Sequence, residues 1–128
     1  MVAVADFAAG LKAYDTGDFA TAMREWRPLA EQGYAIAQFN LGAMYDNGKG
    51  VPEDDAEAVK WYRLAAKQGN AKAQLNLGVM YDNGEGVPED DVQAYAWWNL
   101  AAAQGNKIAS KNKAIIRKRM TSADVSEA

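Results

Sequence analysis

One stretch of 36 residues occurs twice in succession, and this repeat restricts the chain to a small set of folds. Residues 35–70 and 71–106 agree at about 25 of 36 positions, and a period of this length is typical of helical repeat proteins. Residues 1–34 form a shorter, diverged copy. One such unit cannot bury its apolar face alone, so neighbouring units must stack. We therefore expect a single repeat domain over residues 1–128, with a C-terminal segment at 107–128.

Each unit is expected to contain two helices. In the second unit, the first helix should cover residues 35–47, with Ala37, Leu41 and Tyr45 on its buried face. The second helix should cover about 54–68, and the short turns make the two helices antiparallel neighbours. The expected apolar face of the second helix consists of Ala58, Trp61, Tyr62, Ala65 and Ala66, matched in the third unit by Ala94, Trp97, Trp98, Ala101 and Ala102.

A glycine lies inside the first helix of both full units, at Gly42 and Gly78. Glycine costs about 1 kcal/mol relative to alanine in a helix interior. We interpret its presence as a sign that another helix approaches closely at these positions.

An acidic, glycine-rich stretch separates the two helices: MYDNGKGVPEDD at 44–55 and MYDNGEGVPEDD at 80–91. A calcium-binding EF-hand loop needs oxygen ligands at its third and fifth positions. Counting from Asp46, these positions are Gly48 and Gly50, which have no side-chain oxygen. Asp54 instead suits a helix N-cap. We interpret the stretch as a joint between helices, and expect neither a metal site nor a cofactor.

Composition excludes several classes of chemistry. The chain has no cysteine and no histidine, so disulfides, thiolate metal sites and the usual general base near neutral pH are excluded. No apolar run approaches the roughly 18 residues that a membrane-spanning helix needs. Ala3-Val4-Ala5 has the small-x-small form of a signal-peptidase site. From it we expect a periplasmic or secreted protein, with a cytoplasmic location as the alternative.

Charge is divided unevenly along the chain. Residues 1–106 carry 8 basic and 15 acidic side chains, whereas residues 107–120 carry six basic and no acidic ones. The acidic body should repel nucleic acid, and no aromatic residue accompanies the bases to stack on nucleotides. We expect residues 107–120 to form a capping helix with a basic outer face. Its predicted inner side consists of Ile108, Ala109, Asn112, Ile115, Ile116 and Met120. A monomer is expected, with head-to-tail self-association as an alternative.

The segment AQFNLGAMYDNGKGVPEDDAEAVKWYRLAAKQGN resembles the Sel-one-like repeat, a relative of the tetratricopeptide repeat. The tetratricopeptide pattern is matched in the two full units by Gln38, Leu41, Gly42, Tyr45, Ala58 and Tyr62, and by Gln74, Leu77, Gly78, Tyr81, Ala94 and Trp98. The resemblance implies an all-α fold: a right-handed α-solenoid of three antiparallel helix pairs plus a C-terminal capping helix. It also implies a scaffold that holds a protein or peptide ligand.

A second stripe on the first helix of each unit is the candidate binding site. In related solenoids the corresponding positions line the concave surface, so the resemblance implies a groove. Apolar residues bordered by amide and charged groups suit a peptide ligand. An alternative is that Phe39 and Leu75 only pack against the neighbouring unit. The stripe consists of Ile36, Phe39, Asn40 and Ala43 in the second unit, and of Lys72, Leu75, Asn76 and Val79 in the third.

An enzyme is the rival class, because some Sel-one-like proteins of a cysteine-rich type have been discussed as β-lactamase-like. The chain contains one Ser-x-x-Lys sequence, Ser110 to Lys113. The companion signatures of serine β-lactamases are missing, and so are the cysteines. Ser110 is expected on the capping helix, with no pocket around it. We therefore expect no catalytic residues and no enzymatic activity.

The joint interpretation predicts that calcium has no specific effect on the protein. Without side-chain oxygens at Gly48 and Gly50, the acidic stretch should bind Ca²⁺ only weakly and nonspecifically. Calorimetric titration with calcium should give no saturable heat, and the melting temperature should not change. A micromolar dissociation constant would contradict the interpretation.

Overall fold

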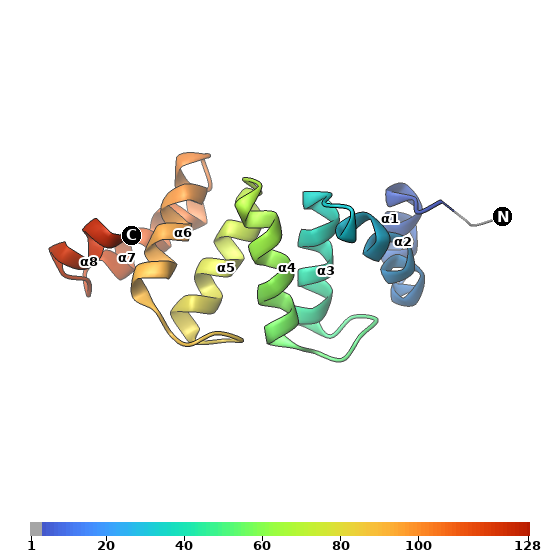
Figure 1. Ribbon diagram of the computed structural model, residues 1–128, viewed down its shortest axis with the longest axis horizontal. Coiled ribbons are helices and arrows are strands. Elements are labelled where there is room, and N and C mark those ends of the chain that lie inside the picture. The colour runs from blue at the N-terminus through green and yellow to red at the C-terminus, as the bar shows by residue number, and fades with distance from the viewer. Residues whose placement is uncertain (1–3) are drawn as a thin grey trace.

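The computed structural model describes residues 4–128, and every regular element in this range is a helix. From α1 to α7 each helix packs against the next, and α8 packs against α6, so that the row runs from the N-terminus at one end of the long axis to the C-terminal helices at the other (Figure 1). The predicted all-α solenoid is confirmed, and the helix ends in the second unit agree with the expected ones to within one residue. The helices are α1 Phe7–Asp15, α2 Phe19–Glu31, α3 Ala35–Asn47, α4 Asp55–Lys67, α5 Ala71–Asn83, α6 Asp91–Ala103, α7 Lys107–Arg117 and α8 Ser122–Glu127.

In each helix pair, an aromatic ring of the second helix packs directly against a glycine of the first helix and holds the two helices close together. A Cβ added to Gly42 would lie 2.6 Å from the Tyr62 ring, and one added to Gly78 would lie 2.4 Å from Nε1 of Trp98. Gly10 and Trp26 form the same contact in the first unit, at 2.2 Å. The close approach predicted from the helical glycines is therefore confirmed, and it requires a residue without a side chain.

The indole N–H groups of this contact are satisfied by the facing helix. Nε1 of Trp98 donates to the backbone carbonyl of Leu75 at 3.0 Å, and Nε1 of Trp26 donates to that of Phe7 at 3.2 Å. Each acceptor lies three residues before the glycine that the ring covers. The hydrogen bond thus fixes the ring at one height along the helix, because a buried indole N–H without a partner is costly.

Buried glutamines connect each unit to the next. Gln38 and Gln74 are each only 4% exposed, and their side-chain amides donate to the carbonyl oxygens of Ala30 and Ala66, both at 3.1 Å. The side-chain oxygen of Gln38 accepts from Gln68 at 2.8 Å, and that of Gln74 accepts from Gln104 at 2.9 Å. The pattern therefore repeats at the 36-residue period and sets the spacing between units.

The acidic stretch is a joint, as predicted. Gly48 caps α3 with a left-handed backbone (φ 65°), and Asp54 begins α4 by accepting from the backbone N–H of Glu57 at 3.2 Å. In the third unit the stretch also touches the preceding unit, since a Cβ on Gly86 would lie 2.4 Å from the carbonyl oxygen of Asp55. The stretch therefore links the helices within a unit and also seats that unit on its neighbour.

Helix α7 corrects one prediction about the cap. Ala109, Ile116 and Met120 are buried as expected, but Ile108 and Ile115 are 60% and 63% exposed. Ile108 and Ile115 lie seven residues apart on a ridge next to the one that contains Ala109 and Ile116, and a single helix face cannot bury both ridges. The helix also ends at Arg117 rather than at residue 120.

The C-terminal segment is fastened to the body by charge as well as by burial. Arg119 pairs with Asp91 of α6 at 3.1 Å and also with Asp82 of α5. Thr121 then opens α8 with a complete capping box, in which the Asp124 carboxylate accepts from the backbone N–H of Thr121.

The structure leaves the expectations about location open. Within residues 4–128, none of the helices combines the length and the apolar character needed to span a membrane. Ala3 of the signal-peptidase-like sequence lies outside the described residues, and Val4 is exposed. The periplasmic or secreted location therefore stays a prediction.

The glycine contact predicts that Gly78→Ala destabilises the protein. Alanine is the better helix former by about 1 kcal/mol, but its Cβ would collide with the Trp98 indole. Overpacking of this kind costs about 1–3 kcal/mol, so the melting temperature should fall by several degrees in spite of the gain in helix propensity. In a Trp98→Phe background the smaller ring should make the same change less harmful. A melting temperature equal to or above that of the parent would contradict the role of the contact.

Candidate protein-binding site

The eight residues of the predicted stripe lie on α3 and α5 and remain partly accessible. We call this set the strip: Ile36, Phe39, Asn40, Ala43, Lys72, Leu75, Asn76 and Val79. Ile36 is 58% exposed and Lys72 is also exposed, whereas the other six are half-buried. The strip therefore combines side chains that are free at the surface with others that are shared with the core.

Phe39 and Leu75 are the strip residues that could serve only to pack against the neighbouring unit instead of binding a ligand. The Phe39 ring lies 5.8 Å from the Tyr62 ring, between centroids, and it joins the cluster built on Ala58, Tyr62 and Leu77. Leu75 packs in the same way on the cluster that contains Trp98. One part of each of these two side chains is therefore buried against the core, and the other part is accessible to solvent.

Tyr62 lies between strip residues of two units. The hydroxyl of Tyr62 donates to the carboxylate of Asp46 at 3.2 Å, and the nearby Asn76 side chain favours a lower pKa for the same tyrosine. Burial raises the pKa of Tyr62 well above its ordinary value, and the nearby charge of Asp46 adds to the shift. Tyr62 therefore brings together Phe39 and Asp46 of α3 and Asn76 of α5.

Asp46 also has a perturbed acidity. Partial burial raises the pKa of the Asp46 carboxyl, and the neighbouring charges of Asp55 and Glu85 act in the same direction, while the Tyr62 hydrogen bond opposes them. Ionised Asp46 is therefore less stable in the folded chain than in water. Among residues 4–128, no group of three acidic side chains is arranged to hold a metal ion.

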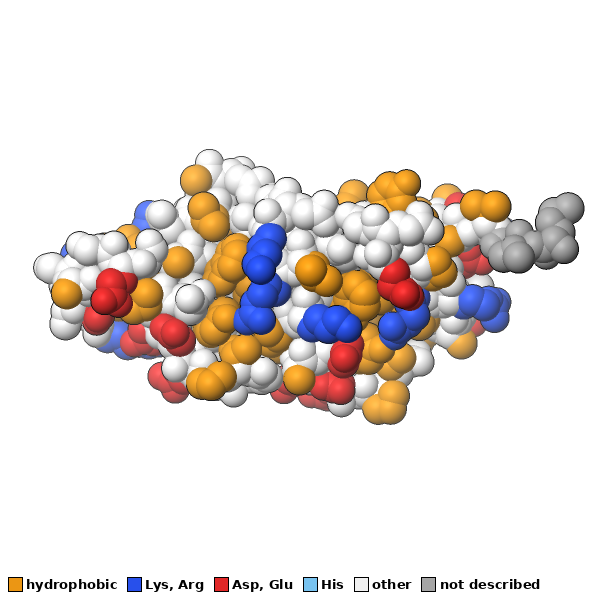
Figure 2. All heavy atoms as spheres, in the orientation of Figure 1, with side chains coloured by type: hydrophobic (Ala, Val, Ile, Leu, Met, Phe, Trp, Pro, Cys, Tyr) orange, Lys and Arg blue, Asp and Glu red, His pale blue; other side chains and the backbone are white. Residues whose placement is uncertain are grey.

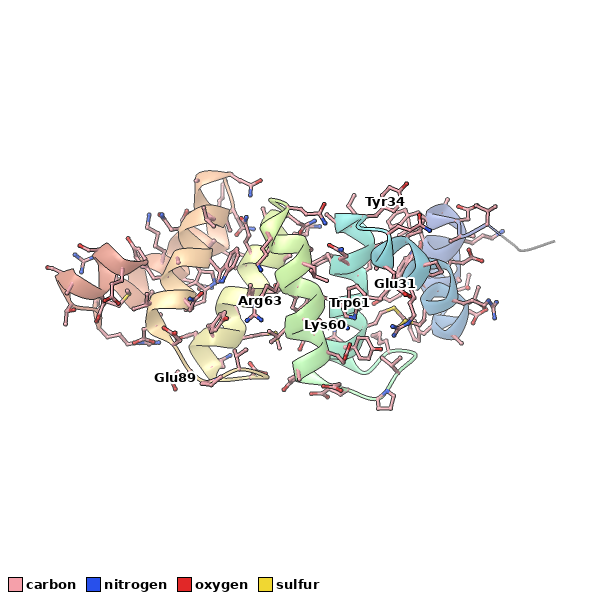
Figure 3. The ribbon with its side chains drawn as sticks, viewed as in Figure 1. Glu31, Tyr34, Lys60, Trp61, Arg63 and Glu89 are labelled. Carbon is pink, nitrogen blue, oxygen red and sulfur yellow. The ribbon has the colours of Figure 1, made fainter. Side chains whose placement is uncertain are left out.

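An apolar pocket adjoins the first residue of the strip. It has a volume of about 430 Å³, and Tyr34 stands at the N-terminus of α3 beside it (Figure 3). Sequence reasoning missed Phe7 and Tyr34. Phe7 could have been found, because it precedes Gly10 by three residues as Phe39 precedes Gly42. The pocket is lined by Phe7, Leu29, Tyr34, Ala35, Ile36 and Ala37.

Other exposed apolar residues extend the strip in both directions. When the units are aligned on their helical glycines, Val4 and Leu11 fall on the positions of Ile36 and Ala43, and they are 89% and 42% exposed. Ile108 and Ile115 of α7 fall on the same two positions at the far end. The misassigned isoleucines of the cap thus belong to the series of strip positions.

Basic side chains lie in a broken row across the middle of one face, with apolar side chains between them (Figure 2). Lys60 and Arg63 of α4 belong to this face (Figure 3). Aromatic rings provide their contacts: the ammonium of Lys60 lies 5.0 Å from the Trp61 ring centroid, and Arg63 donates to the Tyr81 hydroxyl. The Arg63–Tyr81 hydrogen bond links α4 to α5, whereas the Lys60–Trp61 contact lies within α4.

Ser110, the residue behind the enzyme alternative, is exposed and lies at the edge of a shallow cleft. The cleft holds about 160 Å³ and includes Tyr95, Lys113 and Arg117 among its walls. Its presence corrects the expectation that no pocket surrounds Ser110. The hydroxyl of Ser110 donates to the backbone carbonyl of Asn106 at 3.3 Å, so the structure contains no Ser110–Lys113 hydrogen bond of the kind that activates a nucleophile.

An open row of helix pairs with a recurring, partly apolar strip on alternate helices defines the class of helical-repeat solenoid proteins. A family model described as the Sel1 repeat matches residues 35–70 and 71–106. The chain belongs to the Sel1 repeat family, which confirms the resemblance found in its sequence.

Two solved structures are similar to the chain. One is a protective antigen of uropathogenic Escherichia coli strains that displays an SLR fold, with 35% identity and a TM-score of 0.87 over 92% of this chain. The other is a Sel1 repeat protein from Oxalobacter formigenes, with 34% identity and a TM-score of 0.80 over 84% of this chain. The chain spans 26% and 44% of the lengths of these two proteins. A comparison with curated protein sequences finds no match.

The raised pKa of Asp46 predicts that Asp46→Asn stabilises the protein at neutral pH. The favourable contribution of Asp46 is present below its ordinary pKa of 3.8 and is lost as the pH rises through the raised folded value. Asparagine removes the partly buried charge and keeps an acceptor for Tyr62. The melting temperature should therefore rise at neutral pH, and the difference should shrink as the pH falls toward 3.8.

Glu53→Gln is the matched control, because it removes one negative charge from an exposed position of the joint. It should leave the melting temperature nearly unchanged. A lower melting temperature for Asp46→Asn at neutral pH would show that the carboxylate is a net favourable group.

Proposed function

We propose that the chain is a non-catalytic scaffold that binds a protein segment along the strip, with the pocket beside Ile36 receiving an apolar side chain of that segment. Sel1 repeat proteins generally mediate protein–protein interactions, which supports the binding of a protein. The observation that carries the site is the apolar pocket of about 430 Å³, which shares Ile36 with the partly exposed strip.

The pocket and the strip offer a bound segment apolar, hydrogen-bonding and charged contacts. The pocket wall of Phe7, Leu29 and Tyr34 suits an aliphatic or aromatic anchor, and buried anchors of this kind usually carry most of the binding energy. Amide side chains such as Asn40 hydrogen-bond a peptide backbone without requiring one sequence. Exposed Lys72 is available to an acidic residue of the partner.

The competing functions have weaker support. Catalysis would depend on Ser110, whose hydroxyl is hydrogen-bonded to a backbone carbonyl. Nucleic-acid binding would depend on the bases of residues 107–120 against an acidic body. Self-association of a monomer in head-to-tail fashion remains the alternative among protein partners, and salt-sensitive oligomers in light scattering would reveal it.

The test compares two exposed apolar residues that lie on different helices. Ile36→Asp places a charge at the pocket, whereas Leu64→Asp places one on α4, outside the strip, where Leu64 is 40% exposed. Once a partner has been captured, its affinity for both variants is measured by calorimetry. Ile36→Asp should weaken a partner bound at the strip more than tenfold, or by more than about 1.4 kcal/mol, and Leu64→Asp should not.

A second variant, Phe39→Ala with Leu75→Ala, should also weaken binding by more than tenfold. Both residues pack on the core, so circular dichroism must first show that this variant is folded. A partner that binds Ile36→Asp as tightly as the parent but loses affinity for Leu64→Asp would move the site to the other face.

A further inference from the structure

We propose that the cleft between α6 and α7 binds a small oxyanion, that is, a phosphate or carboxylate group. This site is separate from the strip. Its walls are Tyr95 from α6 and Ser110, Lys113, Ala114 and Arg117 from α7. Two cations, a hydroxyl and an aromatic ring therefore surround one small volume.

The 36-residue period explains why these cations line the cleft, although Arg117 is exposed and Lys113 is only partly buried. Lys113 occupies the position of Leu41 and Leu77, both of which are completely buried. In the same way, Arg117 occupies the position of Tyr45 and Tyr81. The sequence thus places two positive charges at positions that form helix-pair contacts in the preceding units.

These two cations have no acidic partner. Within residues 4–128 the ion pairs are those that Arg119 makes with Asp82 and Asp91. The ammonium of Lys113 instead lies 5.7 Å from the Tyr95 ring centroid. Lys113 and Arg117 are four residues apart on one helix, where like charges repel. An anion between them would turn this repulsion into two charge-assisted hydrogen bonds.

Ser110 adds a third donor to the same side of α7. Its hydroxyl makes only a 3.3 Å hydrogen bond to the Asn106 carbonyl, and rotation about its side-chain bond would direct it to a ligand instead. Ser110, Lys113 and Arg117 follow one another at intervals of three and four residues, which aligns them on one helix face. The three donors would therefore converge on an oxyanion.

Size and charge restrict the ligand to a small group. The cleft holds about 160 Å³, compared with about 30 Å³ for one water molecule in the liquid. One tetrahedral oxyanion fits with some of its water. The net charge of residues 1–106, with 8 basic against 15 acidic side chains, disfavours an extended polyanion such as nucleic acid. A terminal phosphate or a carboxylate satisfies both conditions.

The experiment is an NMR titration of the full chain with inorganic phosphate, with chloride added so that the ionic strength stays constant. We expect saturable shifts of the backbone amides near Ser110, Ala114 and Tyr95, with a dissociation constant in the millimolar range. A parallel titration with acetate distinguishes the two ligand classes: a response only to phosphate assigns phosphate groups, and an equal response to acetate assigns carboxylates.

Two variants with the same loss of charge separate a built site from general attraction to a basic helix. Lys113→Gln with Arg117→Gln removes both cations of the cleft, and Lys107→Gln with Lys118→Gln removes two exposed bases of the same segment that do not line it. The first variant should weaken phosphate binding at least tenfold, and the second should change it by less than threefold.

Three results would overturn the proposal. One is the absence of saturable shifts with either anion. Another is a set of shifts spread evenly over all bases of residues 107–120. The third is an equal loss of binding in the two variants, each shown to be folded by its amide spectrum. Any of these results would show that Lys113 and Arg117 are solvent-exposed cations without a specific ligand.

Discussion

The contact between an aromatic ring and a glycine is the interaction on which the rest of the structure depends. Gly10, Gly42 and Gly78 each admit a ring to a distance that no side chain would allow, and this brings the two helices of a pair together. The indole hydrogen bonds to Phe7 and Leu75 then fix the height of the ring. Because the strip lies on the same helices, its residues take their position from this contact.

Interactions between units use polar groups to a greater extent than those within a pair. Gln38 accepts a hydrogen bond from Gln68 at the end of α4 and donates one to Ala30 of α2. Gln74 in the same way accepts from Gln104 at the end of α6 and donates to Ala66 of α4. A buried amide without its partners would cost stability, so only one spacing of the units satisfies all of these groups. The apolar pocket lies at the first of these junctions, which is why it is lined by three helices.

Much of the fold could be predicted because the repeat appears twice with little change. The period, the helical glycines and the N-cap at Asp54 each depend on local sequence. The roles of Gln38 and Gln74 could not be predicted in this way, since a polar residue at a buried position becomes explicable only when its partners in another unit are known. Ile108 and Ile115 were assigned to the wrong ridge for a related reason: an apolar pattern on a terminal helix does not specify which of two adjacent ridges faces the body.

The strip as a binding site stays a prediction, and the sequence did not indicate the pocket beside it. The eight residues of the strip are where the period requires them, yet Phe7 and Tyr34 entered only when the structure showed the pocket. The first unit is shorter than the others, so its residues do not fall at the 36-residue spacing. The cleft around Ser110 was missed because it depends on the arrangement of α6 and α7, and neither helix alone indicates it.

The glutamine hydrogen bonds have a mechanical consequence. Those from Gln38 to Ala30 and from Gln74 to Ala66 connect only adjacent units, as do the Arg–Tyr contacts between Arg27 and Tyr45 and between Arg63 and Tyr81. Because each unit contacts only its neighbours, we expect bending of the solenoid to be concentrated at the junctions between units. A bound segment that spans two junctions would stiffen both of them. The junctions outside the bound segment would keep their own flexibility, so a ligand would straighten only the part of the solenoid that it spans.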